Sequence, residues 1–202
     1  MKSSDNLRLQ GFFKALLRLL LGLFFLLGKK GTAKVPQEGG ILLAANHASF
    51  LDPLFIGTAC PRQVRFMARD SLFRRPGLGG LIAAVGAFPV KRDGVSVDAF
   101  RKALELLDAG RVVLVFPEGT RSYDGSVGPF KTGISMLAER AGVPVVPVAV
   151  AGSWRAWPRN RALPRPARVR VSFGEPITYS GQGHERFADE LRSRVTDMMG
   201  AA

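Results

Sequence analysis

The chain has 202 residues with a formal net charge of +13, and 47% of its residues are apolar. This length suits one domain, and the apolar fraction is sufficient for a sizeable core and excludes a low-complexity chain. The positive charge favours an anionic partner: nucleic acid, an anionic membrane or a phosphorylated substrate. One cysteine, Cys60, excludes an internal disulfide and is typical of a reducing compartment.

The first feature along the chain is a segment rich in Leu and Phe, residues 7–28. Its cations Lys14 and Arg18 lie four residues apart and form, with two glycines, one polar stripe at helical spacing. The uninterrupted apolar part is shorter than the about 20 residues of a comfortable transmembrane helix. We therefore predict a helix in the membrane interface. A membrane span, a signal peptide and a buried helix are the alternatives, and Lys29 and Lys30 favour a cytoplasmic location for the following chain.

Polar residues follow a buried strand predicted over residues 41–45. His47 comes just after this strand, and Asp52 lies five residues later, where Pro53 suits the first turn of a helix. If the turn between them curls back, the Asp52 carboxylate holds one ring nitrogen of His47 and leaves the other as a base. The alternative is a histidine that merely caps the strand.

Further strands alternate with helices along the rest of the chain. Strands are predicted over residues 64–68, 87–92, 112–116, 143–150 and 168–173, and helices over residues 77–86, 97–107, 131–141 and 184–199. This alternation predicts an α/β fold with a mainly parallel sheet flanked by helices. Pro144 and Pro147 remove ladder donors, so we expect residues 143–150 to form an edge or irregular strand.

A second polar cluster, Phe-Pro-Glu-Gly-Thr-Arg-Ser at residues 116–122, also follows a predicted strand. Two strand ends that carry polar clusters suggest one shared site. Farther on, residues 154–170 are basic and contain two tryptophans. Considered alone, this stretch suits binding of nucleic acid. Because it accompanies a lipid-facing helix, we expect it to bind anionic lipid headgroups.

Four stretches resemble, in order, the four sequence blocks of the 1-acyl-glycerol-3-phosphate (lysophosphatidic acid) acyltransferases and the wider glycerolipid acyltransferases. They are Asn-His-x4-Asp at 46–52, Gly-x-Phe-Pro-Val-x-Arg at 86–92, the cluster at 116–122, and Val-Pro-Val-Val-Pro-Val at 143–148. The resemblance runs from about residue 40 to residue 178. It implies an acyltransferase domain over residues 35–202, and the amphipathic pattern described above predicts a membrane-associating segment over residues 1–34 before it.

The resemblance implies transfer of a fatty acyl chain from acyl-CoA or acyl-ACP to the sn-2 hydroxyl of 1-acyl-glycerol-3-phosphate, which gives phosphatidic acid. Another lysolipid acceptor, or a non-catalytic lipid- or nucleic-acid-binding protein, is the alternative. A thioester is already activated, so neither a metal nor a cofactor is expected. No serine or cysteine with a matching base is apparent, which favours direct transfer over an acyl-enzyme.

The same resemblance implies roles for individual residues. His47 is the general base, and Asp52 orients it. The residues implied for the acceptor phosphate come from the blocks and from a position where many relatives carry lysine: Arg121, Glu118, Gly119, Thr120, Arg92 and Arg69. The implied partners are membrane lipids, including an anionic phospholipid surface, and possible acyl carrier protein, with no nucleic acid. The implied location is the cytoplasmic face of the cell membrane.

Overall fold

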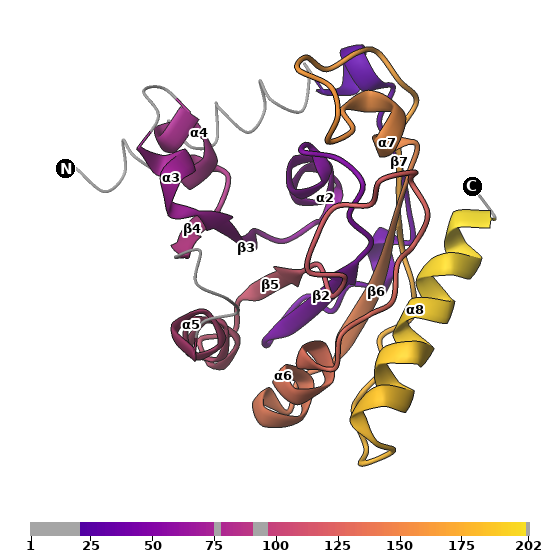
Figure 1. Ribbon diagram of the computed structural model, residues 1–202. Helices are drawn as coiled ribbons and strands as arrows, with labels where there is room; N and C mark the ends of the chain where they lie inside the picture. Colours follow the sequence, from indigo (N-terminus) through magenta and orange to yellow (C-terminus); the bar gives the residue numbers. More distant parts are fainter. Residues whose placement is uncertain (1–20, 75–77, 91–96, 201–202) are drawn as a thin grey trace.

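A seven-stranded sheet forms the centre of the molecule (Figure 1). The computed structural model describes residues 21–74, 78–90 and 97–200. The order across the sheet is β1-β7-β6-β2-β5-β3-β4. The strands are β1 (Gly28–Lys30), β2 (Ile41–Ala45), β3 (Val64–Arg69), β4 (Ala87–Val90), β5 (Val112–Val115), β6 (Val145–Ala151) and β7 (Arg170–Phe173). All neighbours pair in parallel except β6 and β7, which confirms the predicted mainly parallel α/β fold.

Helices cover both faces of this sheet (Figure 1). One face carries α2 (Asp52–Ala59), α3 (Asp70–Phe73) and α4 (Leu78–Ala84), and the other carries α5 (Val97–Asp108), α6 (Gly133–Ala141) and α8 (His184–Gly200). The short helix α7 (Ser153–Ala156) follows β6, and a 3-10 turn, η1 (Thr32–Lys34), follows β1. Because central parallel strands are buried on both faces, they appear in the sequence as continuous apolar runs.

The strand β2 illustrates this two-sided burial. Ile41 and Leu43 belong to the core under α2, whereas Leu42 and Ala44 pack in the core under α5, α6 and α8. All four side chains are fully buried. Successive side chains of β2 therefore enter the two apolar layers in turn, which holds the strand in place. The site begins at the carboxyl end of this strand.

The strand β6 is not an edge strand, so the predicted edge position is wrong, and its irregularity is a one-residue register shift on the β7 side. It pairs with β2 on one side and β7 on the other. Pro144 precedes the first residue pair of the β2–β6 ladder. The N–H and C=O of a strand residue point to the same side, and the Pro147 carbonyl accepts a hydrogen bond from Gly174 on the β7 side. The Pro147 nitrogen therefore also faces β7, and Pro147 removes no donor from the β2 ladder. On the β7 side, the register of the pairing shifts by one residue between the pair Val148–Phe173 and the bridge Val145–Ile177.

The predicted membrane helix lies mostly outside the described residues. Residues 21–25 are helical, and Leu21 and Phe25 pack into the core under the sheet. The neighbouring large side chains face outward: Leu23 is 71% exposed, Phe24 46% and Leu26 60%. Within the described ranges, none of the helices combines the length and apolar character needed to cross a membrane.

The strand β1 lies within the predicted 1–34 segment and pairs in parallel with β7. The contact begins before the strand, because the Val169 N–H donates to the Phe25 carbonyl and the Gly28 N–H donates to the Val169 carbonyl. Residues 28–30 thus form the outermost strand on one side of the sheet. The predicted boundary after residue 34 stays a prediction.

Candidate functional site

The candidate site begins where β2 ends. Both side-chain polar atoms of Asn46 bond the backbone of Val150, with Val150 N–H donating to Oδ1 at 2.8 Å and Nδ2 donating to the carbonyl at 3.3 Å. The side chain of Asn46 thereby continues the β2–β6 pairing one step beyond the last strand residue. His47 follows immediately, so its backbone leaves the sheet from a fixed point.

His47 and Asp52 form the hydrogen bond that their spacing predicts. Asp52 is fully buried, and its Oδ2 lies 2.9 Å from His47 Nδ1. The same oxygen accepts the backbone N–H groups of Ala48 and Ser49, each at 2.7 Å. An ionised carboxylate only accepts hydrogen bonds, so Nδ1 carries the proton and Nε2 presents its lone pair. The His47 side chain is 19% exposed, and the described residues place no hydrogen-bonding partner on Nε2.

The loop after β5 supports this histidine from a second side. The rings of His47 and Phe116 stack, with centroids 3.9 Å apart and an angle of 17° between their planes. The His47 N–H donates to Glu118 Oε1 at 2.8 Å, and the Ser122 N–H donates to the His47 carbonyl at 2.7 Å. Because β2 and β5 are neighbours in parallel, their carboxyl ends share one edge of the sheet, so the two predicted polar clusters do form one site.

Glu118 faces into the protein between two loops. Its Oε1 accepts the His47 N–H, and its Oε2 accepts the Gly128 N–H at 3.3 Å. Burial raises the pKa of this carboxyl, the two backbone donors act in the opposite direction, and the charge of Asp52 raises it further. The geometry therefore makes Glu118 a support for the loop that carries the phosphate-binding candidates.

Gly119 and Thr120 lie in the exposed part of this loop. Gly119 has a φ of +73°, a conformation that side chains disfavour. A Cβ at this position would lie 2.9 Å from Lys131 Nζ, so the lysine chain packs directly over the glycine backbone. Lys131 also donates its N–H to the Pro117 carbonyl at 3.0 Å. The loop thus carries a cation that the sequence analysis did not select.

Arg121 lies against the turn between His47 and Asp52. Its guanidinium carbon is 3.4 Å from the centroid of the Phe50 ring, and the Phe50 ring lies 5.1 Å from that of Trp157. The structure therefore brings the arginine predicted for phosphate next to the predicted base. Phe50 and Phe116 were missed because each stands inside a recognised motif without a polar group to draw attention to it.

The two remaining arginine candidates are only partly located. The backbone of Arg69 ends β3, which lies beside β5, at the same edge of the sheet as His47. The Arg69 side chain and all of Arg92 lie outside what the structure describes. Among the described residues, no three His, Cys, Asp or Glu side chains are placed to hold a metal ion, and we assign no metal site.

A family model described as Acyltransferase matches residues 28–151, from β1 to the end of β6. The chain belongs to this acyltransferase family. The match covers His47, Asp52 and the whole loop that carries Arg121, and it confirms the family that the four sequence blocks predicted.

Several relatives of this chain carry closely related names. The 1-acyl-sn-glycerol-3-phosphate acyltransferase BAT2 of Brassica napus chloroplasts is 34% identical over 158 residues, which is 77% of this chain and 45% of the relative. The 1-acyl-sn-glycerol-3-phosphate acyltransferase of Bacillus subtilis is 27% identical over 172 residues, 81% of this chain and 83% of the relative. The chain spans about half the length of the plant relatives, 45% in Brassica and 50% in Arabidopsis thaliana.

A solved structure shares the fold. The crystal structure of the 1-acyl-sn-glycerophosphate (LPA) acyltransferase PlsC from Thermotoga maritima superposes with a TM-score of 0.82 at 27% sequence identity. The superposition covers 100% of this chain and 83% of that chain. The arrangement of the seven strands and their helices is therefore the family's fold.

Proposed function

We propose that this acyltransferase moves a fatty acyl chain from acyl-CoA or acyl-ACP to the sn-2 hydroxyl of 1-acyl-glycerol-3-phosphate, which gives phosphatidic acid. The observation that carries the proposal is a buried carboxylate–imidazole pair beside an arginine in one loop cluster. The names of the relatives support the same acceptor. Another lysolipid acceptor is the alternative that the experiment below distinguishes.

His47 supplies the general base in this proposal. An alcohol has a pKa far above 7, so its attack on a thioester needs a group that removes the proton in the transition state. His47 Nε2 takes that proton as the sn-2 oxygen bonds to the thioester carbonyl carbon. The tetrahedral intermediate then expels the thiolate, which receives the proton from the imidazolium. Asp52, bonded at Nδ1, stabilises the positive ring between these two steps.

Arg121 binds the acceptor phosphate in this proposal. A guanidinium fork matches two phosphate oxygens, which a lysine point charge does not. The Gly119 backbone allows close approach, and Thr120 adds a hydroxyl donor in the same exposed loop. Glu118 acts behind the loop, since its carboxylate would repel a phosphate and both of its oxygens accept backbone N–H groups. Arg69 and Arg92 remain further candidates for the same phosphate.

Direct transfer, without an acyl-enzyme, is supported by the surroundings of two possible nucleophiles, Cys60 and Ser49. Cys60 is buried, and burial raises the pKa of its thiol, which disfavours the thiolate that a nucleophile needs. Ser49, close to His47 in the turn, donates its hydroxyl to the Trp157 carbonyl at 3.1 Å. Neither group has the activating base that covalent catalysis requires.

An anionic membrane surface, on the cytoplasmic side, is the proposed partner. The arginine segment, residues 154–170, contains six arginines and no acidic residue. All six are exposed, and none forms an ion pair with an acid in the described part of the chain: Arg155, Arg159, Arg161, Arg165, Arg168 and Arg170. The outward-facing Leu23, Phe24 and Leu26 lie beside this segment, since Val169 bonds Phe25. Cations beside exposed apolar groups suit a lipid surface better than nucleic acid.

The reaction is tested by following free thiol release with acyl-CoA or acyl-ACP and one acceptor at a time. Lysophosphatidic acid should support turnover, and His47→Ala should lower kcat by about a hundred- to ten-thousand-fold. Arg121→Ala should act chiefly on the KM for lysophosphatidic acid. Equal turnover of lysophosphatidylcholine or a lyso-aminolipid would favour the alternative acceptor. No turnover by folded protein with either donor would contradict the enzymatic proposal.

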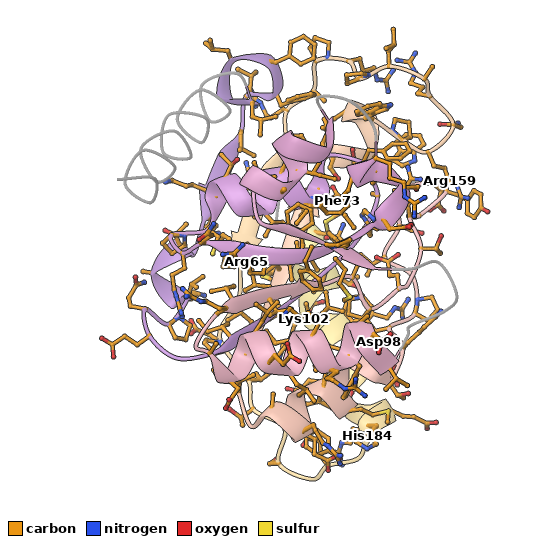
Figure 2. The ribbon with its side chains drawn as sticks, turned by 90° about the vertical axis from the view of Figure 1, so that its left-hand side faces the viewer. Arg65, Phe73, Asp98, Lys102, Arg159 and His184 are labelled. Carbon is orange, nitrogen blue, oxygen red and sulfur yellow. The ribbon has the colours of Figure 1, made fainter. Side chains whose placement is uncertain are left out.

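Membrane binding is tested with vesicles that contain either anionic or only zwitterionic lipid. Changing Arg155, Arg161 and Arg168 together to Gln should weaken binding to anionic vesicles and reduce its salt dependence. The matched control removes the same charge from α5, α6 and α8 by changing Arg101, Arg140 and Arg186 to Gln. Figure 2 shows Arg159 of the arginine segment in the upper part of the molecule, and His184, the first residue of α8, at its lower end. Equal losses in both sets, or tighter binding to DNA than to vesicles, would contradict the proposed surface.

A further inference from the structure

The guanidinium of Arg121 rests on a small aromatic platform. Phe50 lies under it at 3.4 Å from the ring centroid and keeps 47% of its own surface exposed. The Phe50 ring meets that of Trp157 at 5.1 Å with an angle of 47° between the planes. The backbone joins the same two residues, because the Phe50 N–H donates to the Trp157 carbonyl at 3.4 Å. Three loops, after β2, β5 and β6, therefore meet at this platform.

An aromatic ring on the face of a guanidinium has a specific consequence. The N–H donors of arginine lie in the plane of the group, so a ring on the face leaves their direction unchanged while it restricts rotation of the side chain. The contact also places a cation over the negative face of the ring, which is favourable. A planar fork held in this way is preorganised for two oxygens of an anion in the same plane.

Phe50 also belongs to the turn that presents the base, between His47 and Asp52 in the sequence. In the proposed acceptor, the phosphate and the reacting hydroxyl stand on adjacent glycerol carbons. The phosphate anchor must therefore lie at a matching distance from the base, because an arginine that has to be ordered first binds the phosphate less tightly. One turn that carries His47 and also supports Arg121 provides that matching distance.

We infer that Phe50 is a positioning residue that holds Arg121 for the acceptor phosphate and so contributes to selection of phosphate-bearing acceptors. This inference rests on the proposed function. It extends that function by assigning specificity to a side chain that carries no charge and no hydrogen-bonding group. Trp157 completes the platform as the second ring.

The test uses the full chain and separates the ring face from mere bulk. Phe50→Leu keeps an apolar side chain but removes the ring, and the KM for lysophosphatidic acid should rise by about three- to thirty-fold with kcat within about two-fold. Phe50→Tyr keeps the ring and should restore most of that loss. Arg121→Lys keeps the charge but loses the planar stack, so its KM should rise at least as much as that of Phe50→Leu. Met136→Leu on α6 is the matched control, since Met136 is 49% exposed.

A double-mutant cycle decides whether Phe50 acts through Arg121. In the Arg121→Ala background, Phe50→Leu should change the KM by less than about two-fold, because the group it positions is gone. An equal KM loss in both backgrounds would overturn the inference and show that Phe50 contacts the acceptor or the bilayer itself. A normal KM in Phe50→Leu together with a raised KM in Arg121→Ala would overturn this inference alone. Absence of turnover by the wild-type chain would instead overturn the proposed function.

Discussion

Arg62 and Arg121 lie at opposite ends of the same strands and make different kinds of contact. Arg62 lies at the amino ends of β2 and β5 and donates to four backbone carbonyls, those of Pro36, Glu38, Gly39 and Gly110. Arg121 lies at the carboxyl ends, with its guanidinium carbon over the Phe50 ring at 3.4 Å from the centroid. One guanidinium closes loops by bonding the backbone, and the other is oriented by a ring. The comparison teaches that one residue type closes loops at the amino ends of the strands and lies beside the predicted base at their carboxyl ends.

This comparison predicts a division between the carboxyl edge of the sheet, where the strands end, and the amino edge, where they begin. Substitutions at the carboxyl edge should change kinetic constants more than stability. Substitutions at the amino edge should do the reverse, because none of the candidate site residues that the structure describes lies there. Asp52→Asn and Arg62→Met test the two sides of that division, and Glu118→Gln and Asp124→Asn test how the stability of the loop after β5 depends on pH.

Asp52→Asn should give the largest effect. The variant keeps the side-chain volume but removes the charge that stabilises the imidazolium, so kcat should fall by about a hundred-fold. Steady-state kinetics measure this change, and thermal unfolding checks that the buried turn still forms. Wild-type kcat in a folded Asp52→Asn variant would remove Asp52 from the reaction.

Arg62→Met should lower the free energy of unfolding by about 2 kcal/mol, because four carbonyls lose a charged donor. The apolar stem is kept, and water replaces part of the lost bonding at the exposed carbonyls. Urea denaturation measures the stability, and kcat and KM of the folded variant should match the wild type. A raised KM with unchanged stability would break the proposed division between the edges.

Glu118→Gln should change how stability depends on pH. Burial raises the folded-state pKa of Glu118 above its usual 4.5, so the folded state binds the proton more tightly than the unfolded state. The protonated carboxyl therefore stabilises the fold below pH 4.5, and this contribution is lost as pH rises through the folded-state pKa. Unfolding curves of wild type and variant across this window should diverge in that direction, and parallel curves would contradict it.

Asp124→Asn should give the smallest effect. Hydrogen bonds from Ser126, followed by one from Ser122, lower the pKa of this exposed carboxyl from 3.8 to about 2. Its charge therefore supports the loop above pH 3.8, and that support disappears as pH falls through about 2. The stability difference from wild type should be small near neutral pH, weaker in salt, and absent at the acidic end. A difference that grows on acidification would contradict this sign.

The sequence allowed the His47–Asp52 bond to be predicted because the turn that makes it is local. Five residues and a helix start at Asp52 determine the geometry. The contacts of Phe116, Glu118 and Phe50 could not be predicted, since they depend on how loops after different strands meet. The edge position predicted for β6 failed because the sequence shows which donors the prolines lack but not which neighbour those donors would face.

One predicted site residue, Gly119, and one strand, β1, show a different limit. Gly119 was selected for close approach of backbone to ligand, yet the structure adds Lys131 over it, twelve positions along the chain. The strand β1 was not predicted, because Gly-Lys-Lys has no alternating or apolar pattern. Its strand character comes from the exposed edge of β7, which is a property of the assembled sheet and not of the three residues.

The pairing of β1 with β7 has a consequence for biosynthesis. Gly28 pairs with Arg170, so the ribosome releases one strand of this pair long before the other. The inner strands β2, β5 and β6 can pair before β1 has a neighbour to pair with. The β1 side of the sheet forms only after β7 has emerged. Completion of the sheet therefore waits until residue 173 has emerged from the ribosome. During that interval the nascent chain carries an open strand edge that a chaperone or a second nascent chain is able to engage.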